Sequence, residues 1–383
     1  MPYGIRSTGQ SIPYFAINRV AVSDSRRPSW LQEVGIQAAF HAFGREVMAL
    51  HFLYDWGPFR IDALGLVTMI GAEEVDGAIG RLVSNPWTEY LPLLGSFIAA
   101  GNRFVQPIPG VTLYNITDGI KATDVSGWLS RWLNFQDPSW NNTIFIWGSQ
   151  QVPWRERTVQ FRALALGALL NGGLLTLTVL VGDWFGFANT AALITSVFVR
   201  WYMLRLNRAY LDEGATSMSG RGAEFVKVFC LLTDGKAVTL QAPRGLVVNG
   251  FLTTPRPYHK HGYKLCRAIG WVAFGIHVIC IGQASLFIQI PTVVIMIAAT
   301  VACVTGIGCD ERHIGRRIHV YRASEEGVDD QRSLAYARLD LSDEEENSMV
   351  AWGLFPQRSN KAWWHKYQRL KESMKLEDNI LRT

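Results

Sequence analysis

Two stretches of the chain are almost free of charged side chains, and the longer one, residues 268–309, contains no Asp, Glu, Lys or Arg. At about 1.5 Å of rise per residue, a helix of this length would extend for roughly 63 Å, about twice the ~30 Å hydrocarbon core of a bilayer. The polar, proline-containing stretch 282–291 divides it near the middle. The pattern therefore predicts two membrane-spanning helices joined by a turn.

The other stretch comes earlier in the chain and has the same organisation. Residues 163–182 are uncharged and rich in Leu, Ala and Gly, Asp183 interrupts them, and residues 184–199 are apolar again and can be extended through 201–204. Uncharged runs of this length are typical of membrane spans. We therefore predict a mainly α protein with four transmembrane helices in two hairpins, together with a mixed α/β cytosolic part.

Basic residues flank the four predicted helices at the ends away from the turns. They are Arg162 before the first helix, Arg200, Arg205 and Arg208 at the end of the second, Arg267 before the third and Arg316 after the fourth. Neither turn contains Lys or Arg, so the positive-inside rule places all four flanks, and with them the N- and C-termini, in the cytosol. We expect Arg162, Arg205, Arg267 and Arg316 at the membrane interface. The N-terminus lacks the apolar core of a signal peptide, which favours the same orientation.

This orientation makes a prediction about glycosylation. Asn115-Ile-Thr and Asn141-Asn-Thr both have the form of an acceptor site. Because only sites that enter the secretory lumen are modified, we expect both to remain unmodified.

The two hairpins divide the chain into five parts. These are a cytosolic N-terminal region (1–160), the first transmembrane hairpin (161–205), a cytosolic loop with short β-strands (206–265), the second transmembrane hairpin (266–310) and a cytosolic helical tail (311–383). In the N-terminal region the pattern predicts a helix around residues 30–52, then turns and short strands over 107–154. The apolar piece 90–100 is too short to span a bilayer. It is expected to form either a helix buried in the cytosolic domain or a re-entrant or interfacial helix.

The cytosolic loop between the hairpins is rich in β-formers. Residues 224–232 and 237–241 read as two strands joined at Asp234-Gly235, a strong hairpin signal, and residues 244–252 offer a third strand. A sheet this small would be marginal alone, so we expect it to pack with the N-terminal region.

The tail carries helix signals. Ser342-Asp-Glu-Glu345 has the pattern of a capping box, and a later helix is expected to begin near residue 360. Trp363, Tyr367, Leu370 and Met374 form one stripe of that helix, with basic residues beside it. The stripe would rest either on the anionic cytosolic leaflet or on the protein's own cytosolic domain.

Charge and cysteine content exclude some functions. The formal net charge of +5 comes from clusters beside the apolar stretches, and no basic face for nucleic acid is apparent. The five cysteines have no paired spacing and are expected to be free thiols. No metal-ligand set, cofactor motif or catalytic motif occurs, so we expect no metal and no cofactor, and the catalytic residues, if any, are unknown.

Polar residues within the predicted spans are the main candidates for function. His277 is expected near mid-depth, and Asn171 and Ser196 reach a similar depth when counted from Arg162 and Arg205. These side chains could form one polar layer across the bundle. Hydrogen bonds that fix helix packing are the simpler interpretation, and a ligand-binding or catalytic role of His277 is the alternative.

Three pieces of the sequence resemble a known family. They are APRGLVVNGFLTTPRP before the third predicted span, RAIGWVAFGIHVICIGQASLF within it, and YARLDLSDEEENSMVAWGLFPQRSN followed by KAWWHKY in the tail. They resemble a family of multi-pass integral membrane proteins of filamentous ascomycete fungi that has no assigned activity. The resemblance covers roughly residues 160–370, implies a fungal membrane protein and carries over no catalytic residue.

Three functions are compatible with these patterns. The first is a membrane-anchored interaction or scaffold protein, in which the spans hold a cytosolic domain built from the N-terminal region, the middle strands and the tail. The second is a membrane enzyme that acts on a lipid or hydrophobic metabolite and uses His277 or the interfacial His259, His261 and His313. The third is an oligomeric channel or uncoupled transporter. The expected partners are membrane lipids and either a second copy or another membrane protein, and the sequence does not indicate the organelle.

Overall fold

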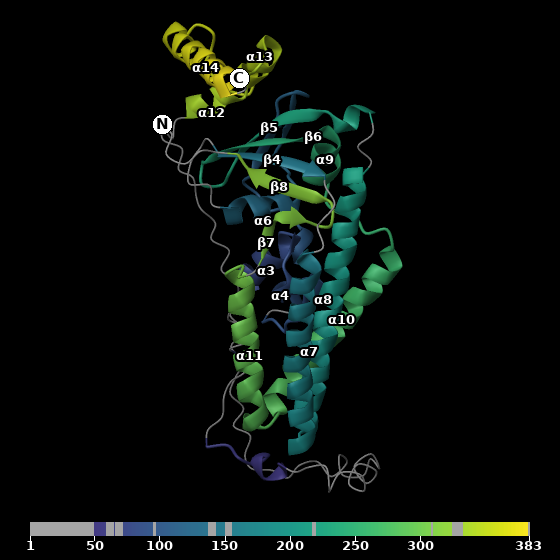
Figure 1. Ribbon diagram of the computed structural model, residues 1–383. Helices are drawn as coiled ribbons and strands as arrows, with labels where there is room; N and C mark the ends of the chain where they lie inside the picture. Colours follow the sequence, from purple (N-terminus) through teal and green to yellow (C-terminus); the bar gives the residue numbers. More distant parts are fainter. Residues whose placement is uncertain are drawn as a thin grey trace, which may run out of the picture. The chain divides into compact units, whose positions relative to one another are not determined.

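Four long helices dominate the computed structural model, which describes residues 50–58, 65, 72–94, 97–136, 143–149, 155–216, 220–307, 309–323 and 332–381. The helix predicted around residues 30–52 falls almost entirely outside these ranges, as does Asn141. The long helices are α7 (Arg155–Val181), α8 (Trp184–Thr216), α10 (Lys260–Gln283) and α11 (Leu286–Val304) (Figure 1).

Three of these helices are long and apolar enough to cross a membrane. They are α7 from Thr158 to Val181, α10 and α11. The fourth, α8, is longer but carries Asn189, Thr190, Ser196 and Arg200 within its apolar stretch. The protein is therefore mainly helical with a mixed α/β part, as predicted, while the described residues contain three such helices and not the four that were expected.

The two turns that join the long helices are short and bonded to each other. Gly182 and Asp183 separate α7 from α8, and Ala284 and Ser285 separate α10 from α11. The second turn is thus shorter than the predicted stretch 282–291. The Asp183 carboxylate accepts hydrogen bonds from the backbone N–H of Gly186 at 2.8 Å and of Ser285 at 2.6 Å. Both turns therefore lie at the same end of the helices.

The strands form one mixed sheet of eight, in the order β1-β7-β8-β4-β6-β5-β2-β3. Their bounds are β1 Val83–Ser84, β2 Thr112–Asn115, β3 Ile120–Ala122, β4 Thr143–Ser149, β5 Phe225–Leu231, β6 Ala237–Pro243, β7 Asp310–Ile314 and β8 Ile318–Arg322. β4 and β6 run parallel, and the other described pairs are antiparallel. The predicted hairpin of the middle loop, β5–β6, pairs with strands of the N-terminal region, which confirms the expected packing.

The sheet also explains where the helices begin and end. β4 precedes α7, β5 and β6 lie between α8 and α10, and β7 follows α11. The four helix ends away from the turns therefore all lead into the same sheet.

An aromatic core fixes one helix against the sheet. Trp128 and Trp132 of α6 (Gly127–Gln136) pack on Trp147 of β4, with ring centroids 5.9 and 4.7 Å apart. Phe145 and Phe251 complete this fully buried group. Aromatic rings in such edge-on arrangements contribute roughly 0.5–1.5 kcal/mol per pair beyond their burial. The strands expected over 107–154 are present, whereas α6 was not predicted.

Two further predictions of local structure are wrong. Residues 244–252 form a helical segment, α9 (Arg244–Leu246) continued by a π-helix (Val247–Phe251), and not a strand. Val247 and Phe251 are buried there and the Gly250 carbonyl accepts the Trp128 indole N–H at 2.9 Å, so tertiary contacts override the β-propensity. The tail is not wholly helical, because β7 and β8 come first. β7 and β8 carry many charged side chains, so their sequence did not indicate strands, although a sheet with one exposed face can contain such residues.

The C-terminal residues form a helical module on the sheet, made of α12 (Arg332–Arg338), α13 (Asp343–Ala351) and α14 (Lys361–Leu381). The capping box at Ser342 and Glu345 is present as predicted. Trp364 and Tyr367 of α14 are buried in a second core with Phe229 of β5, and the rest of the stripe packs against it. The stripe therefore docks on the protein's own domain, which decides between the two interpretations offered above.

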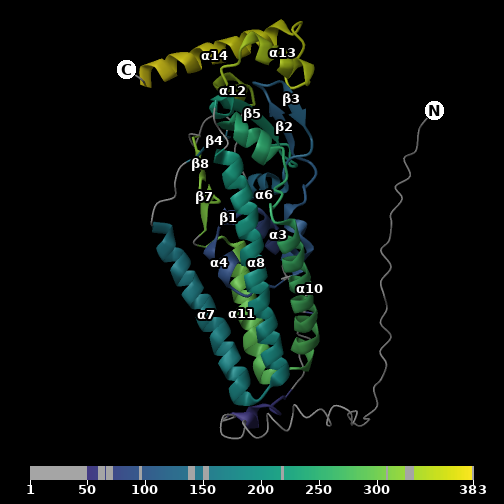
Figure 2. The same cartoon turned by 90° about the vertical axis from the view of Figure 1, so that its right-hand side faces the viewer.

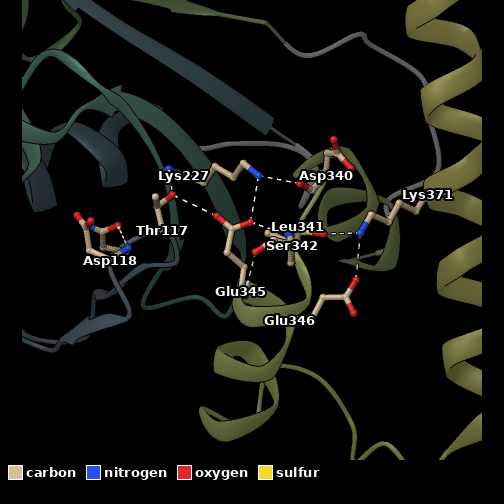
Figure 3. A network of polar contacts seen from close by, with 10 residues as sticks. Thr117, Asp118, Lys227, Asp340, Leu341, Ser342, Glu345, Glu346 and Lys371 are labelled. Carbon is tan, nitrogen blue, oxygen red and sulfur yellow. Dashed lines mark hydrogen bonds and ion pairs between the residues drawn. The ribbon is translucent and has the colours of Figure 1, made fainter. Parts of the chain in front are cut away.

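Polar contacts surround this second core (Figure 3). Lys227 of β5 donates to the Asp340 carbonyl at 2.7 Å and pairs with Glu345 at 3.2 Å. On the other side of α13, Lys371 of α14 pairs with the buried Glu346 at 3.1 Å. Burial raises the pKa of the Tyr367 hydroxyl, with the nearby Glu346 charge as the second cause.

Candidate functional site: a segment inserted between the helices

Residues 83–105 leave the sheet, enter the space between the long helices and return. Their elements are β1, α4 (Pro86–Tyr90), α5 (Phe97–Gly101) and the 3-10 turn Arg103–Val105. α4 contacts α7, α8 and α11, whereas α5 contacts α8 and α10, and Figure 2 shows α4 between α7 and α8. Residues 90–100 were expected to form one short helix, but α4 ends at Tyr90 and α5 begins at Phe97, so they do not form a single helix.

Local sequence signals start and stop α4. The Asn85 side-chain oxygen accepts the N–H of Trp87 at 3.0 Å and of Thr88 at 3.3 Å, and Pro86 occupies the first helical position. This is the favoured chemistry of a helix N-terminus. At Leu91 the backbone turns to an extended conformation, which ends the helix after five residues.

Glycine allows the backbones to approach closely. A Cβ at Gly167 of α7 would lie 2.4 Å from the Tyr90 carbonyl oxygen, and a Cβ at Gly270 of α10 would lie 2.9 Å from the Cβ of Ala100. The inserted segment therefore fits only because these two helix positions carry no side chain.

The extended part of the segment bonds to α11. The Leu94 N–H donates to the Thr300 hydroxyl at 3.0 Å, and the Leu94 side chain is buried with Leu193, Val293 and Met296. Thr300 lies four residues before the last residue of α11, Val304, which is about 6 Å inside the helix end at the usual rise. Non-helical backbone at such a place needs protein partners for its polar groups, and Thr300 supplies one.

Arg200 of α8 closes the other end of α4. Its side chain is 1% exposed, its Nε donates to the Thr88 carbonyl at 2.5 Å and its Nη2 donates to the Leu91 carbonyl. These carbonyls belong to the C-terminal end of α4, where the helix dipole favours a positive charge. Nη1 has no partner among the described residues. Arg200 is thus a buried cap that fixes the inserted segment to α8.

Arg208 lies two turns further along α8 and contacts the first residues of the inserted segment. It pairs with the buried Glu89 at 2.5 Å and donates to the carbonyls of Leu82 at 2.9 Å and Val83 at 2.6 Å. Buried charges that are paired and hydrogen-bonded on both sides are costly to disrupt, by about 3–5 kcal/mol when one partner is removed.

Two cysteines belong to the same junction. The Cys303 thiol lies 3.1 Å from the Thr88 hydroxyl, and the Cys309 thiol donates to the Ser84 carbonyl at 3.9 Å. Burial raises the pKa of Cys309 to about 12, so it remains a neutral thiol. All five cysteines are free, as predicted, and this pair acts in packing and weak hydrogen bonding and not as a nucleophile.

The predicted interface arginines separate into two groups. Arg267 is half-buried and donates to the carbonyls of Ala100 at 2.9 Å and Gly101 at 3.2 Å, so it caps α5 as Arg200 caps α4. Arg162 and Arg205 are exposed, and Arg205 lies over the Trp201 ring. Arg316 is exposed in the β7–β8 turn, where its backbone N–H donates to Asp212 at 3.0 Å.

No contact of the structure joins the three predicted intramembrane polar residues into a layer. Asn171 donates to the Gly167 carbonyl of its own helix at 2.8 Å. His277 Nδ1 lies 2.6 Å from the side-chain oxygen of Asn189, which the sequence analysis had not selected, and His277 Nε2 has no partner among the described residues. Ser196 is buried. His277 meets α8 at Asn189, five residues after the helix starts at Trp184, and the common depth of the three residues stays a prediction.

The histidines do not assemble into a site either. His259 and His277 lie at opposite ends of α10, 18 residues and so about 27 Å apart along the helix. His313 pairs with Asp310 of its own strand at 2.7 Å. Within the ranges that the structure describes, no group of three or more His, Cys, Asp or Glu side chains could hold a metal ion.

Sequence reasoning missed the residues that hold the inserted segment. It grouped Arg200 and Arg208 with Arg205 as basic residues that close the second predicted span, and it gave them no separate role. Comparison of the chain with protein-family models, with curated proteins and with solved structures finds no match.

Proposed function

We propose that the protein is a four-span integral membrane protein whose two hairpins hold the eight-stranded sheet and its C-terminal module at the cytosolic face, where the sheet and module bind other proteins. One observation supports this most directly. The segment before α7, the connection between α8 and α10, and the segment after α11 all contribute strands to the same sheet. A design of this kind keeps a folded surface close to the bilayer.

In this proposal α8 is the fourth span. Its polar groups are used inside the protein: Arg200 caps α4, Asn189 pairs with His277, and the hydroxyls of Thr190 and Thr195 bond to carbonyls of their own helix. Polar side chains in spans normally face the bundle interior and are paired in this way. The lower hydropathy of α8 is therefore compatible with a membrane location.

The orientation rests on charge. The exposed Arg162, Arg205 and Arg316 all lie toward the sheet end of the helices, and the two turns have no Lys or Arg. By the positive-inside rule the sheet then faces the cytosol and the turns face the opposite side of the membrane.

A photo-crosslinking amino acid placed at two exposed positions tests the role of the sheet. Tyr321 of β8 is 48% exposed and represents the sheet, and Val294 of α11 is 57% exposed and represents the helix surface. We expect the probe at Tyr321 to give a discrete protein adduct in intact cells and the probe at Val294 to give lipid adducts. If Tyr321 gives no protein adduct while Val294 reacts with lipid, the protein is in the membrane but its sheet is not an interaction surface.

A further inference from the structure

Residues 50–58 lie at the turn end of the long helices. The Leu50 N–H donates to the Leu180 carbonyl at 2.9 Å, one residue before the end of α7. The Trp56 ring stands edge-on to the ring of Phe287, the second residue of α11, with centroids 6.5 Å apart. The segment thus contacts both hairpins next to their turns.

The next helix, α3 (Ala72–Gly80), belongs to the other end. Its Asp76 pairs with Arg131 of α6 at 2.6 Å, and Arg81, which follows it, pairs with Glu311 of β7 at 2.9 Å. Pro58 and Ala72 therefore lie at opposite ends of helices such as α11, whose 19 residues extend for about 28 Å.

The composition of residues 50–58 suits the lipid interface on the turn side. Phe52 is 73% exposed and Trp56 47%, and at the same end Trp184 and Phe185 are 44% and 46% exposed. Aromatic rings of this kind concentrate where the headgroups meet the hydrocarbon. Like the two turns, the segment contains no Lys or Arg, which is typical of the side opposite the cytosol.

We propose that residues 50–58 lie on the extracytosolic face of the membrane, with Phe52 and Trp56 in its lipid interface. This rests on the proposed function, because it requires the long helices to span. It replaces the expectation that residues 1–160 are cytosolic throughout.

Three single-cysteine additions test this in sealed cells with a membrane-impermeant maleimide. Labelling of Phe52→Cys measures the accessibility of residues 50–58 from outside the cell. Gln283→Cys does the same for the α10–α11 turn, and Asp234→Cys for the β5–β6 turn of the sheet. All three positions are exposed. Four native cysteines are buried and Cys309 is half-buried, so the unmodified protein gives the background.

We expect the Phe52→Cys and Gln283→Cys variants to be labelled from outside and the Asp234→Cys variant only after permeabilisation. Labelling of Gln283→Cys alone would overturn the proposal while leaving the spanning hairpins intact. Equal behaviour of Gln283→Cys and Asp234→Cys would instead contradict the proposed function itself. A fluorophore on the Phe52→Cys variant is expected to be quenched by headgroup-labelled lipid at least twofold more than the same fluorophore on the Asp234→Cys variant. Equal quenching would contradict the interfacial location.

Discussion

The two helical hairpins differ in length and in composition: α7 and α8 have 27 and 33 residues, whereas α10 and α11 have 24 and 19. In the second hairpin, α10 and α11 both have the composition of membrane spans. In the first, α7 has it and α8 does not, because α8 carries the polar groups that contact the inserted segment and α10. The difference shows that a helix between other helices can exchange apolar side chains for buried polar contacts. Hydropathy alone therefore underestimates such a helix.

Removing the cap of α4 is expected to give the largest effect. Arg200→Leu leaves the carbonyls of Thr88 and Leu91 without their donor, and the loss of unfolding free energy should be about 3–5 kcal/mol. The measurement is thermal unfolding of the purified protein in mild detergent. Arg205→Leu, on the same helix but exposed, is the matched control and should change stability by about 0.5 kcal/mol or less. Similar losses in both variants would mean that the inserted segment is not held by Arg200.

The contact between the two turns comes next. Asp183→Ala removes the acceptor of the Gly186 and Ser285 N–H groups, and bonds to a charged partner of this kind contribute about 2–3 kcal/mol in total. Asp234→Ala removes a carboxylate from an exposed turn and should cost less than about 1 kcal/mol. Thermal unfolding of both variants measures the difference. A neutral Asp183→Ala variant would show that the hairpins do not depend on each other at this end.

A smaller loss of stability is expected when the contact between the inserted segment and α11 of the second hairpin is removed. Thr300→Val removes the acceptor of the Leu94 N–H at nearly constant volume, which should cost about 1 kcal/mol. Thr305→Val, an exposed position whose hydroxyl bonds to its own helix, serves as control and should cost less than half as much. If Thr300→Val were as destabilising as Arg200→Leu, the two hairpins would hold the segment equally and the contrast between them would fail.

The sheet should respond to acid through His319 of β8. Burial, and secondarily the nearby His313, lowers the pKa of His319 in β8 below its ordinary value of 6.5. The unfolded chain then binds more protons just below pH 6.5, so stability falls as the pH is lowered from 6.5 toward the folded-state pKa. His319→Gln should flatten this dependence. Fluorescence of the core tryptophans during denaturant unfolding at pH 7 and pH 5.5 measures the change in unfolding free energy. If this change were the same in His319→Gln as in the unmodified protein, His319 would not be its cause.

The sequence predicted what depends on local pattern. The long helices, the β5–β6 turn at Asp234-Gly235, the capping box at Ser342 and the helix from Lys361 all follow from periodicity or from side-chain chemistry within a few residues. It did not predict contacts between distant residues. Arg200 and the Thr88 carbonyl are 112 positions apart in the chain, and no local signal joins them.

The same reasoning explains the errors in secondary structure. The β-branched residues of 244–252 favour a strand, but Val247 and Phe251 gain more by packing in the aromatic core as a helical turn. Residues 310–322 form two strands although they carry many charges, since β7 and β8 present one face to solvent. His277 was correctly selected as buried and polar, while its partner Asn189 lies near a turn and was not considered.

The central claim is that α8 crosses the membrane as the fourth span, and a glycosylation acceptor on a flexible insert between Val181 and Gly182 tests it most directly. Expressed in a eukaryotic host, the insert is expected to give a glycosidase-sensitive mass increase, because it faces the lumen. The same insert at Gly235, and the native Asn115 sequence, should give none. A mass increase at Gly235 and none at the α7–α8 turn would contradict the account.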